Sequence, residues 1–372
     1  MAPQERFRFD PRGLPIYPQC TLNSLPWLPE RTILVVRAGS HAYGTSLPTS
    51  DLDYRGIAVA PKSWRDGFIR KFEQAEIRDP ADVVIFNLAK IFALMADCNP
   101  NIIELVFVDE ADVLLCTEGG RLLREHRDEF LSKRAVHRFR GYAMAQLKRI
   151  RTHKHWLLEP SDHQPTREEF GLPQRTVIPG DQLAAAQAEV KKLVDSWEID
   201  FTGLADSEII YIQQQLHRHL ADIHVGKEEK CNIAARILGY DTNFIELLER
   251  ERRYNSAQTN WTQFQEWKAN RNEKRSELER QFGYDTKHAM HLVRLMRMCR
   301  EVLTTGQVLV KRPDAEELLA IRGGAWSYER LIEWAEFEDT DLQEVAKTSV
   351  LPKHPDMNSL DKLCQEITRL MD

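Results

Sequence analysis

Hydrophobic residues in the first third of the chain follow the spacing of strands and short helices. The β-branched run Thr32–Arg37 predicts a strand, residues 51–59 alternate with a period of two, and Asp82–Phe86 predicts a third strand. Asn87 is placed to cap a helix whose apolar positions over residues 88–95 follow helical spacing. This part of the chain therefore combines strands with helices.

The pattern changes after Gly119-Gly120 to long helical segments rich in Glu, Arg, Lys and Gln. Residues 164–180 interrupt these segments with several prolines and two glycines, which predicts a loop or linker. Helices are expected at Asp181–Trp197, Ser207–His224, most of Asn243–Gln281 and Asp285–Leu303. We therefore expect an α+β fold in which a small mixed sheet with helices over 1–120 precedes a mainly α-helical domain over 121–372.

Composition narrows the class of protein. A chain of 372 residues suggests two domains, and its longest apolar stretches are far shorter than the ~18–20 residues of a membrane span. The first twenty residues lack the apolar core of a signal peptide, and the six cysteines are scattered without a C-x-x-C pair. We therefore expect a cytoplasmic protein without membrane contact, in a reducing compartment.

Charge and common motifs exclude several functions. The net charge of -6, from 51 basic and 57 acidic residues, argues against a chain that binds nucleic acid over its whole surface. A local basic groove remains compatible with this balance. The sequence has no G-x-x-x-x-G-K-[ST] phosphate loop, no H-E-x-x-H and no G-x-S-x-G.

The most informative chemistry lies just after the first predicted strand. Gly39-Ser40 follows that strand, where a glycine lets the backbone approach an anionic ligand. Asp51 and Asp53 lie two apart on the next predicted strand, so both carboxylates share a face about 7 Å apart. Such a pair is stabilised by a shared proton or a divalent metal, and two metals ~3.5–4 Å apart serve phosphoryl transfer. By itself, D-x-D is also typical of solvated surface.

This order of G-S, about ten residues, and D-x-D resembles the signature of the DNA polymerase beta nucleotidyltransferase superfamily. The resemblance is closer to its RNA-repair-pathway branch. It is carried by residues 39–56, 82–86, 99–105, 139–143, 146–147, 287–295 and 320–322. It spans most of the chain, with weaker support between Thr176 and Gln281.

The resemblance implies three carboxylates on one sheet that hold two Mg²⁺ ions, with Mn²⁺ as an alternative. Asp51 and Asp53 match the first two carboxylates and would hold the metal on the triphosphate. Asp82 is the best match for the third, with Glu76 as the alternative. Together with Asp53, it would hold the metal that activates the attacking hydroxyl.

The same resemblance assigns the phosphate contacts. Ser40 would donate its hydroxyl and backbone N–H to the β- and γ-phosphates, and Gly39 would provide clearance. Arg55 either neutralises phosphate charge or forms a salt bridge with Asp53. Tyr43 and His41 either contact the nucleotide or pack.

Two basic segments in the helical half are further candidates. Lys287, His291 and Arg294 fall at i, i+4 and i+7 of one predicted helix, opposite an apolar stripe. They would bind the nucleotide or form a solvated face. The second segment, residues 148–155, is followed by Trp156, a combination that suits single-stranded nucleic acid or, again, a solvated face.

The resemblance predicts a metal-dependent nucleotidyltransferase. It would move a nucleoside monophosphate from a nucleoside triphosphate such as ATP to a hydroxyl, with an RNA 3′ end as the leading acceptor and pyrophosphate as the product. The alternatives are a toxin-like enzyme that modifies a protein or tRNA, and an inactive nucleotide- or RNA-binding module. Base preference and oligomeric state stay open.

Overall fold

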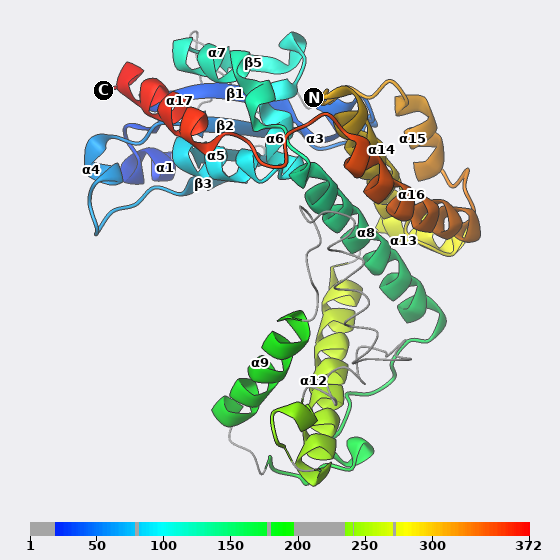
Figure 1. Cartoon of the computed structure of the whole chain (residues 1–372). Helices are drawn as coiled ribbons and strands as arrows, with labels where there is room; N and C mark the ends of the chain where they lie inside the picture. The colour runs from blue at the N-terminus through cyan, green and yellow to red at the C-terminus, as the bar shows by residue number, and fades with distance from the viewer. Residues whose placement is uncertain (1–18, 79–81, 177–179, 197–234, 241, 271–272) are drawn as a thin grey trace. The chain divides into compact units, whose positions relative to one another are not determined.

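A computed structural model describes the chain except for residues 1–18, 79–81, 177–179, 197–234, 241 and 271–272 (Figure 1). The described residues form two compact units, one built from the chain up to Leu158 and after residue 272, and the other from 159–271. These units do not coincide with the expected domains 1–120 and 121–372. The division of the chain into a catalytic core and a helical substrate-binding domain stays a prediction.

The first unit contains a mixed sheet, as predicted, and this sheet has five strands. Its strands are β1 (Thr32–Ala38), β2 (Asp53–Ala58), β3 (Gln74–Ile77), β4 (Asp82–Asn87) and β5 (Val113–Cys116), in the order β3-β4-β2-β1-β5. Strands β2 and β4 are parallel, and the other neighbours are antiparallel. The three predicted strands are confirmed, whereas the four-residue strands β3 and β5 were not predicted.

Apolar side chains cover both faces of this sheet. Val36 and Ile57 lie on one face and belong to the large core that the helices complete. Val35, Tyr54 and Ile85 lie on the other face in a smaller core. Burial on both faces explains why β1 is a nearly continuous apolar run rather than an alternating one.

Short helices flank and connect the strands, and the cap predicted at Asn87 is confirmed. They are α1 (Gln19–Ser24), α2 (Leu28–Arg31), α3 (Gly39–Tyr43), α4 (Lys62–Arg65), α5 (Leu88–Ala96), α6 (Pro100–Phe107) and α7 (Glu118–Glu125). The Asn87 side chain accepts a 2.8 Å hydrogen bond from the Ala89 amide and caps α5. Asn99 caps α6 in the same way, with Pro100 at its first position.

Two long helices, α8 (Arg134–Leu158) and α14 (Thr286–Thr305), pack extensively on each other in the same unit. Asp285 caps α14, and the predicted apolar stripe is buried at Ala289, Leu292, Met296, Cys299 and Leu303. The unit also contains α13 (Glu273–Phe282), α15 (Ala315–Arg322), α16 (Tyr328–Thr348) and α17 (Met357–Leu370). Helix α17 packs on α7 and α5, so the end of the chain stabilises the sheet module.

The second unit contains α9 (Gly180–Ser196) and α12 (Thr242–Ala269). Helix α9 matches the prediction at 181–197, while the long segment predicted at 243–281 is divided into α12 and α13. The helix predicted at Ser207–His224 lies outside the described residues.

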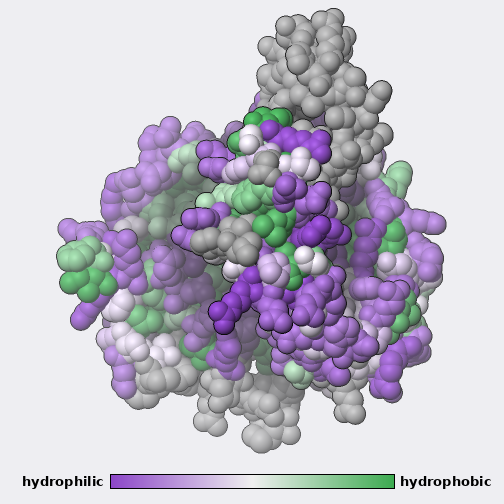
Figure 2. Space-filling view, turned by 90° about the horizontal axis from the view of Figure 1, so that it is seen from below, coloured by the Kyte–Doolittle hydropathy of each residue, from purple (hydrophilic) through white to green (hydrophobic). Residues whose placement is uncertain are grey.

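Among the residues that the structure describes, no helix is both long and apolar enough to span a bilayer. Figure 2 shows a mainly hydrophilic surface with scattered hydrophobic side chains on the face drawn.

Candidate active site

The register of the sheet brings two of the predicted carboxylates together. Asp53 is the first residue of β2 and pairs with Ala38 at the end of β1 and with Asp82 at the start of β4. Because β2 and β4 are parallel and in register here, both carboxylates project from the same face at the same end of the sheet. Asp51 is exposed and lies two residues before β2, so the strand starts later than the predicted start at residue 51 and does not include this carboxylate.

Gly39 lies directly against the Asp53 carboxylate. Its φ of +64° lies in the left-handed region, and a Cβ at this position would lie 2.2 Å from the Asp53 Oδ2. A side chain there would be strained and would displace the carboxylate. The structure therefore requires a glycine at position 39, because a side chain there would occupy the position of the Asp53 carboxylate.

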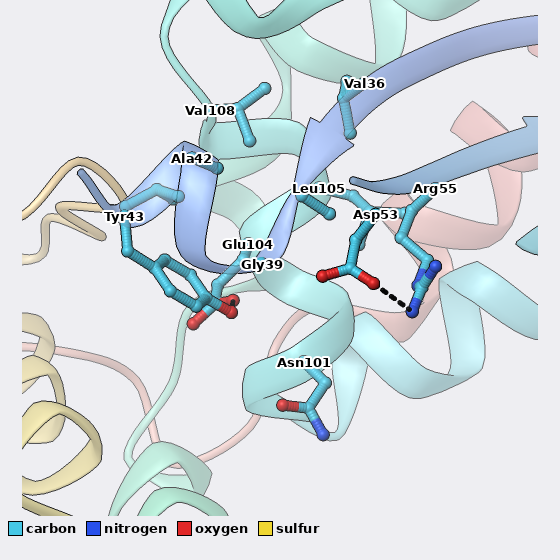
Figure 3. A pocket seen from close by; sticks show the side chains of 12 residues that line it. Val36, Gly39, Ala42, Tyr43, Asp53, Arg55, Asn101, Glu104, Leu105 and Val108 are labelled. Atoms are coloured by element: carbon cyan, nitrogen blue, oxygen red, sulfur yellow. Dashed lines mark hydrogen bonds and ion pairs between the residues drawn. The ribbon is translucent and has the colours of Figure 1, made fainter. Parts of the chain in front are cut away.

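Arg55 lies on the same face two residues along β2 and pairs with the carboxylates. Its Nη2 is 3.1 Å from Asp82 Oδ2 and 4.0 Å from Asp53 Oδ1. Figure 3 shows the contact between Arg55 and Asp53 as a dashed line. Of the two predicted roles for Arg55, the salt bridge is the one that this structure contains.

The Asp53 carboxyl holds its proton unusually tightly. Burial raises its pKa above the usual value, the Asp82 and Asp51 carboxylates raise it further, and Arg55 opposes them. The site thus gathers the partly buried Asp53 and the exposed Asp51 and Asp82, and a divalent cation would relieve the repulsion between their carboxylates. Their oxygen atoms are the ligands that Mg²⁺ prefers.

A pocket of about 200 Å³ opens beside Asp53. Its walls come from the sheet, α3 and α6, and Figure 3 shows the polar side chains of Tyr43, Asp53, Arg55, Asn101 and Glu104 among apolar ones. The apolar lining consists of Val36, Ala38, Ala42, Leu105, Val108 and Val310.

Two of the residues that line the pocket, Tyr43 and Glu104, form a buried group with Arg294. Arg294 on α14 donates a 2.5 Å hydrogen bond from Nη1 to Glu104 Oε1, and the Tyr43 hydroxyl donates a 2.6 Å bond to Oε2. The Arg294 guanidinium also lies 3.8 Å from the centre of the Tyr43 ring. Burial and the neighbouring Glu104 carboxylate raise the pKa of Tyr43 and Arg294 opposes them, so the phenol stays a neutral donor.

The sequence analysis missed Glu104. A single carboxylate inside the apolar run 102–107 was the available signal, because a charge in a buried helix requires a partner.

Comparison with known proteins relates part of the chain to a family. Residues 24–159 match the model of the RNA repair pathway DNA polymerase beta family. Over this segment the chain is similar to that family. The segment contains the whole sheet, Gly39, all the acidic residues of the site and most of the pocket lining. Neither the curated proteins nor the solved structures include a significant match to the chain.

Arg294 lies beyond the segment matched by the family model, and the structure corrects the surroundings expected for it. Its side chain is buried rather than exposed with Lys287 and His291 on one cationic stripe. Lys287 is exposed, whereas burial and nearby cations, Arg294 first, lower the pKa of the half-buried His291 to about 3. His291 is therefore neutral at neutral pH. Nucleotide contacts by Lys287 and His291 stay predictions.

The two candidates for the third acid of a polymerase beta-like site occupy different strands. Asp82 is in register with Asp53, whereas Glu76 lies one strand further out on β3 and accepts a hydrogen bond from Gln74. Asp82 is the better placed of the two to share an ion with Asp53.

Ser40 and the second basic segment have more ordinary surroundings. Ser40 is half-buried beside Gly39 in α3, but the described pocket lining includes only the glycine. In the basic segment of α8, Arg151 pairs with Glu336, and Lys154 lies over the Tyr328 ring. Trp156 is buried against His153, so the expectation of a free ring for stacking a base is wrong.

Proposed function

We propose that the protein is a metal-dependent nucleotidyltransferase that moves a nucleoside monophosphate from a nucleoside triphosphate to a hydroxyl and releases pyrophosphate. One observation carries this proposal. Asp53 and Asp82 stand in register at one end of the sheet, with Gly39 so close to Asp53 that no side chain fits between them. The similarity of residues 24–159 to a polymerase beta family supports the same reaction class.

Asp51, Asp53 and Asp82 would hold Mg²⁺, or Mn²⁺ as an alternative. When bound, such ions neutralise phosphate charge and lower the pKa of the attacking hydroxyl. Arg55, which contacts both Asp53 and Asp82, would offset the remaining phosphate charge. Gly39 would let the phosphates approach the backbone, with Ser40 as a donor next to it and Lys287 as a more distant cation.

Glu104 would act as a positioning residue. It lines the pocket, and its two oxygens are occupied by Arg294 and Tyr43, so it fixes α6 against α3 and α14. Arg294 would then support the pocket wall without touching the triphosphate. This assignment replaces the expected phosphate contact.

An RNA 3′ end is the proposed acceptor, and ATP is the first triphosphate to test. The family description supports involvement of RNA. The helical region over 121–372 would supply the acceptor surface. We place the protein in the cytoplasm, consistent with the free thiols of Cys98, Cys116, Cys299 and Cys364.

The decisive experiment incubates the full chain with each α-labelled nucleoside triphosphate, total RNA, and Mg²⁺ or Mn²⁺. We expect label in RNA with the wild type. The control variant Asp66→Asn, which changes an exposed aspartate at the end of α4, should label RNA equally well. Asp53→Asn should abolish labelling while preserving the far-UV circular dichroism spectrum.

Other outcomes of this experiment distinguish the remaining functions. Label in protein or only in tRNA would favour a toxin-like enzyme. No label with any triphosphate would favour an inactive binding module and overturn the proposed reaction.

A further inference from the structure

Three potential metal ligands meet where α8 packs against the start of α14. His153 comes from the last turns of α8, Asp285 is the N-cap of α14, and His288 lies in its first turn. One ligand atom from each residue lies within 4.8 Å of the other two. Asp285 Oδ2 is 3.7 Å from His153 Nδ1 and 3.6 Å from His288 Nε2.

These separations match the spacing of metal ligands better than that of direct hydrogen bonds. Zinc bonds to nitrogen and oxygen of about 2.0–2.1 Å at a tetrahedral angle place two ligand atoms roughly 3.3 Å apart. Hydrogen bonds between nitrogen and oxygen lie mostly at ~2.7–3.2 Å. The two distances to Asp285 exceed that range and lie within a few tenths of an ångström of the tetrahedral edge, and the two histidine nitrogens lie within 4.8 Å of each other.

The surroundings hold the three side chains in place. The Asp285 side chain is fully buried, and its Oδ1 accepts a 3.0 Å hydrogen bond from the His288 amide, which directs Oδ2 toward both imidazoles. His153 and His288 are only 15% and 14% exposed. Trp156 stacks on the His153 ring with centroids 5.4 Å apart and restricts its rotation.

We propose that His153, Asp285 and His288 bind one divalent transition-metal ion of the zinc type. Two imidazoles and one carboxylate suit zinc and its transition-metal neighbours, whereas Mg²⁺ prefers oxygen ligands. This site is therefore distinct from the Asp51–Asp53–Asp82 cluster, and it does not depend on the nucleotidyltransferase proposal. The three ligands that the structure describes leave the fourth position of a tetrahedron for water or another donor.

The ion would clamp α8 to the first turn of α14. Arg294 lies six residues further along α14, about 9 Å along the helix axis, so the clamp would fix the helix that supports the pocket wall. In sequence the three ligands gave no signal, because His153 lies more than 130 residues before the other two. His288 and Asp285 alone look like a capped helix start.

The test measures zinc binding to the full chain after removal of any histidine tag and of bound metal with a chelator. We expect one zinc per chain for the wild type, by titration calorimetry and by metal analysis after dialysis. His137→Gln is the matched control, because His137 is an exposed histidine on the same helix. It should bind zinc like the wild type.

Two ligand variants should lose at least tenfold in zinc affinity. Asp285→Ser keeps an N-cap of similar strength and removes the carboxylate, so loss of affinity would not reflect loss of the helix. His153→Gln removes an imidazole from the other helix. Zinc should raise the melting temperature of the wild type and His137→Gln but not of these variants, since a ligand stabilises only the state that it binds.

The opposite results would overturn the proposal. Absence of bound zinc in the wild type, or equal zinc affinity in the wild type and Asp285→Ser, is incompatible with this site. If Asp285→Ser folds poorly without metal, Co²⁺ spectra of the wild type and His153→Gln decide the question. A visible absorption band that is unchanged in His153→Gln would exclude that histidine as a ligand.

Discussion

Replacing Arg294 by Met tests how the pocket wall is held together. The substitution preserves much of the side-chain length but removes a charge that is 3% exposed and bonded to the equally buried Glu104. Glu104 would then keep its negative charge inside the core with only the Tyr43 hydroxyl as a donor. An uncompensated charge of this kind is strongly destabilising.

The expected magnitude follows from the burial of the pair. Opposite charges about 4 Å apart attract by ~4 kcal/mol at an effective dielectric constant near 20. Removing one partner from a buried pair typically costs about 3–5 kcal/mol. At roughly 2 °C or more per kcal/mol for a unit of this size, Arg294→Met should lower the melting temperature by at least about 6 °C.

The assay is thermal and urea unfolding followed by circular dichroism, with two comparisons. Arg297→Met, one turn away on α14, removes a 23% exposed arginine paired with Asp314 and Glu317 and should cost only about 1 kcal/mol. The double variant Arg294→Met/Glu104→Gln should regain part of the loss, because the buried charge is gone.

A loss below about 1 kcal/mol for Arg294→Met would refute this reasoning. So would a double variant less stable than the single one. If Arg294→Met instead raises the KM for the triphosphate without lowering stability, the arginine contacts the nucleotide as the sequence first indicated.

Three further predictions concern Gly39, Asp53 and Lys287. Gly39→Ala should reduce nucleotidyl transfer about 10²-fold, because the new Cβ displaces the Asp53 carboxylate. The left-handed backbone at this position should cost only ~1–2 kcal/mol of stability. Normal transfer by this variant would contradict the close approach of Gly39 to Asp53. In chelator, Asp53→Asn should be more stable than the wild type at pH 8 and lose this advantage toward pH 4, as followed by melting temperature. Because the pKa of Asp53 is raised in the native state, the carboxyl of the unfolded chain loses its proton at a lower pH than that of the folded chain. The stability of the wild type therefore falls as the pH rises from ~4 through the native pKa. If the difference in melting temperature between the variant and the wild type did not depend on pH, the raised pKa of Asp53 would be excluded as its cause. Lys287→Ala should raise the KM for the triphosphate while leaving the melting temperature nearly unchanged; an unchanged KM would make Lys287 a surface residue.

Features that depend on neighbouring residues could be predicted from the sequence. The strand Thr32–Ala38, the cap at Asn87 and the start of α14 at Asp285 follow from local periodicity and side-chain-to-backbone hydrogen bonds. The spacing of Gly39, Ser40, Asp51 and Asp53 indicated the family that residues 24–159 resemble for the same reason, because this motif occupies one continuous segment from the end of β1 through α3 to the start of β2. The strands β3 and β5 escaped prediction because four residues carry too little alternation to mark a strand.

Only the tertiary structure decided which charges are buried and which side chains meet. Arg294 and Glu104 are 190 residues apart, and helical periodicity alone placed the arginine on a polar stripe. Packing of α14 beside α6 and α8 buries the Arg294 side chain. The buried charge is compensated by the Glu104 carboxylate, with which Arg294 forms a hydrogen bond. His153 and Asp285 also meet only through tertiary packing. The apolar faces of α8 and α14 fit against each other, and this fit depends on residues far apart in the sequence.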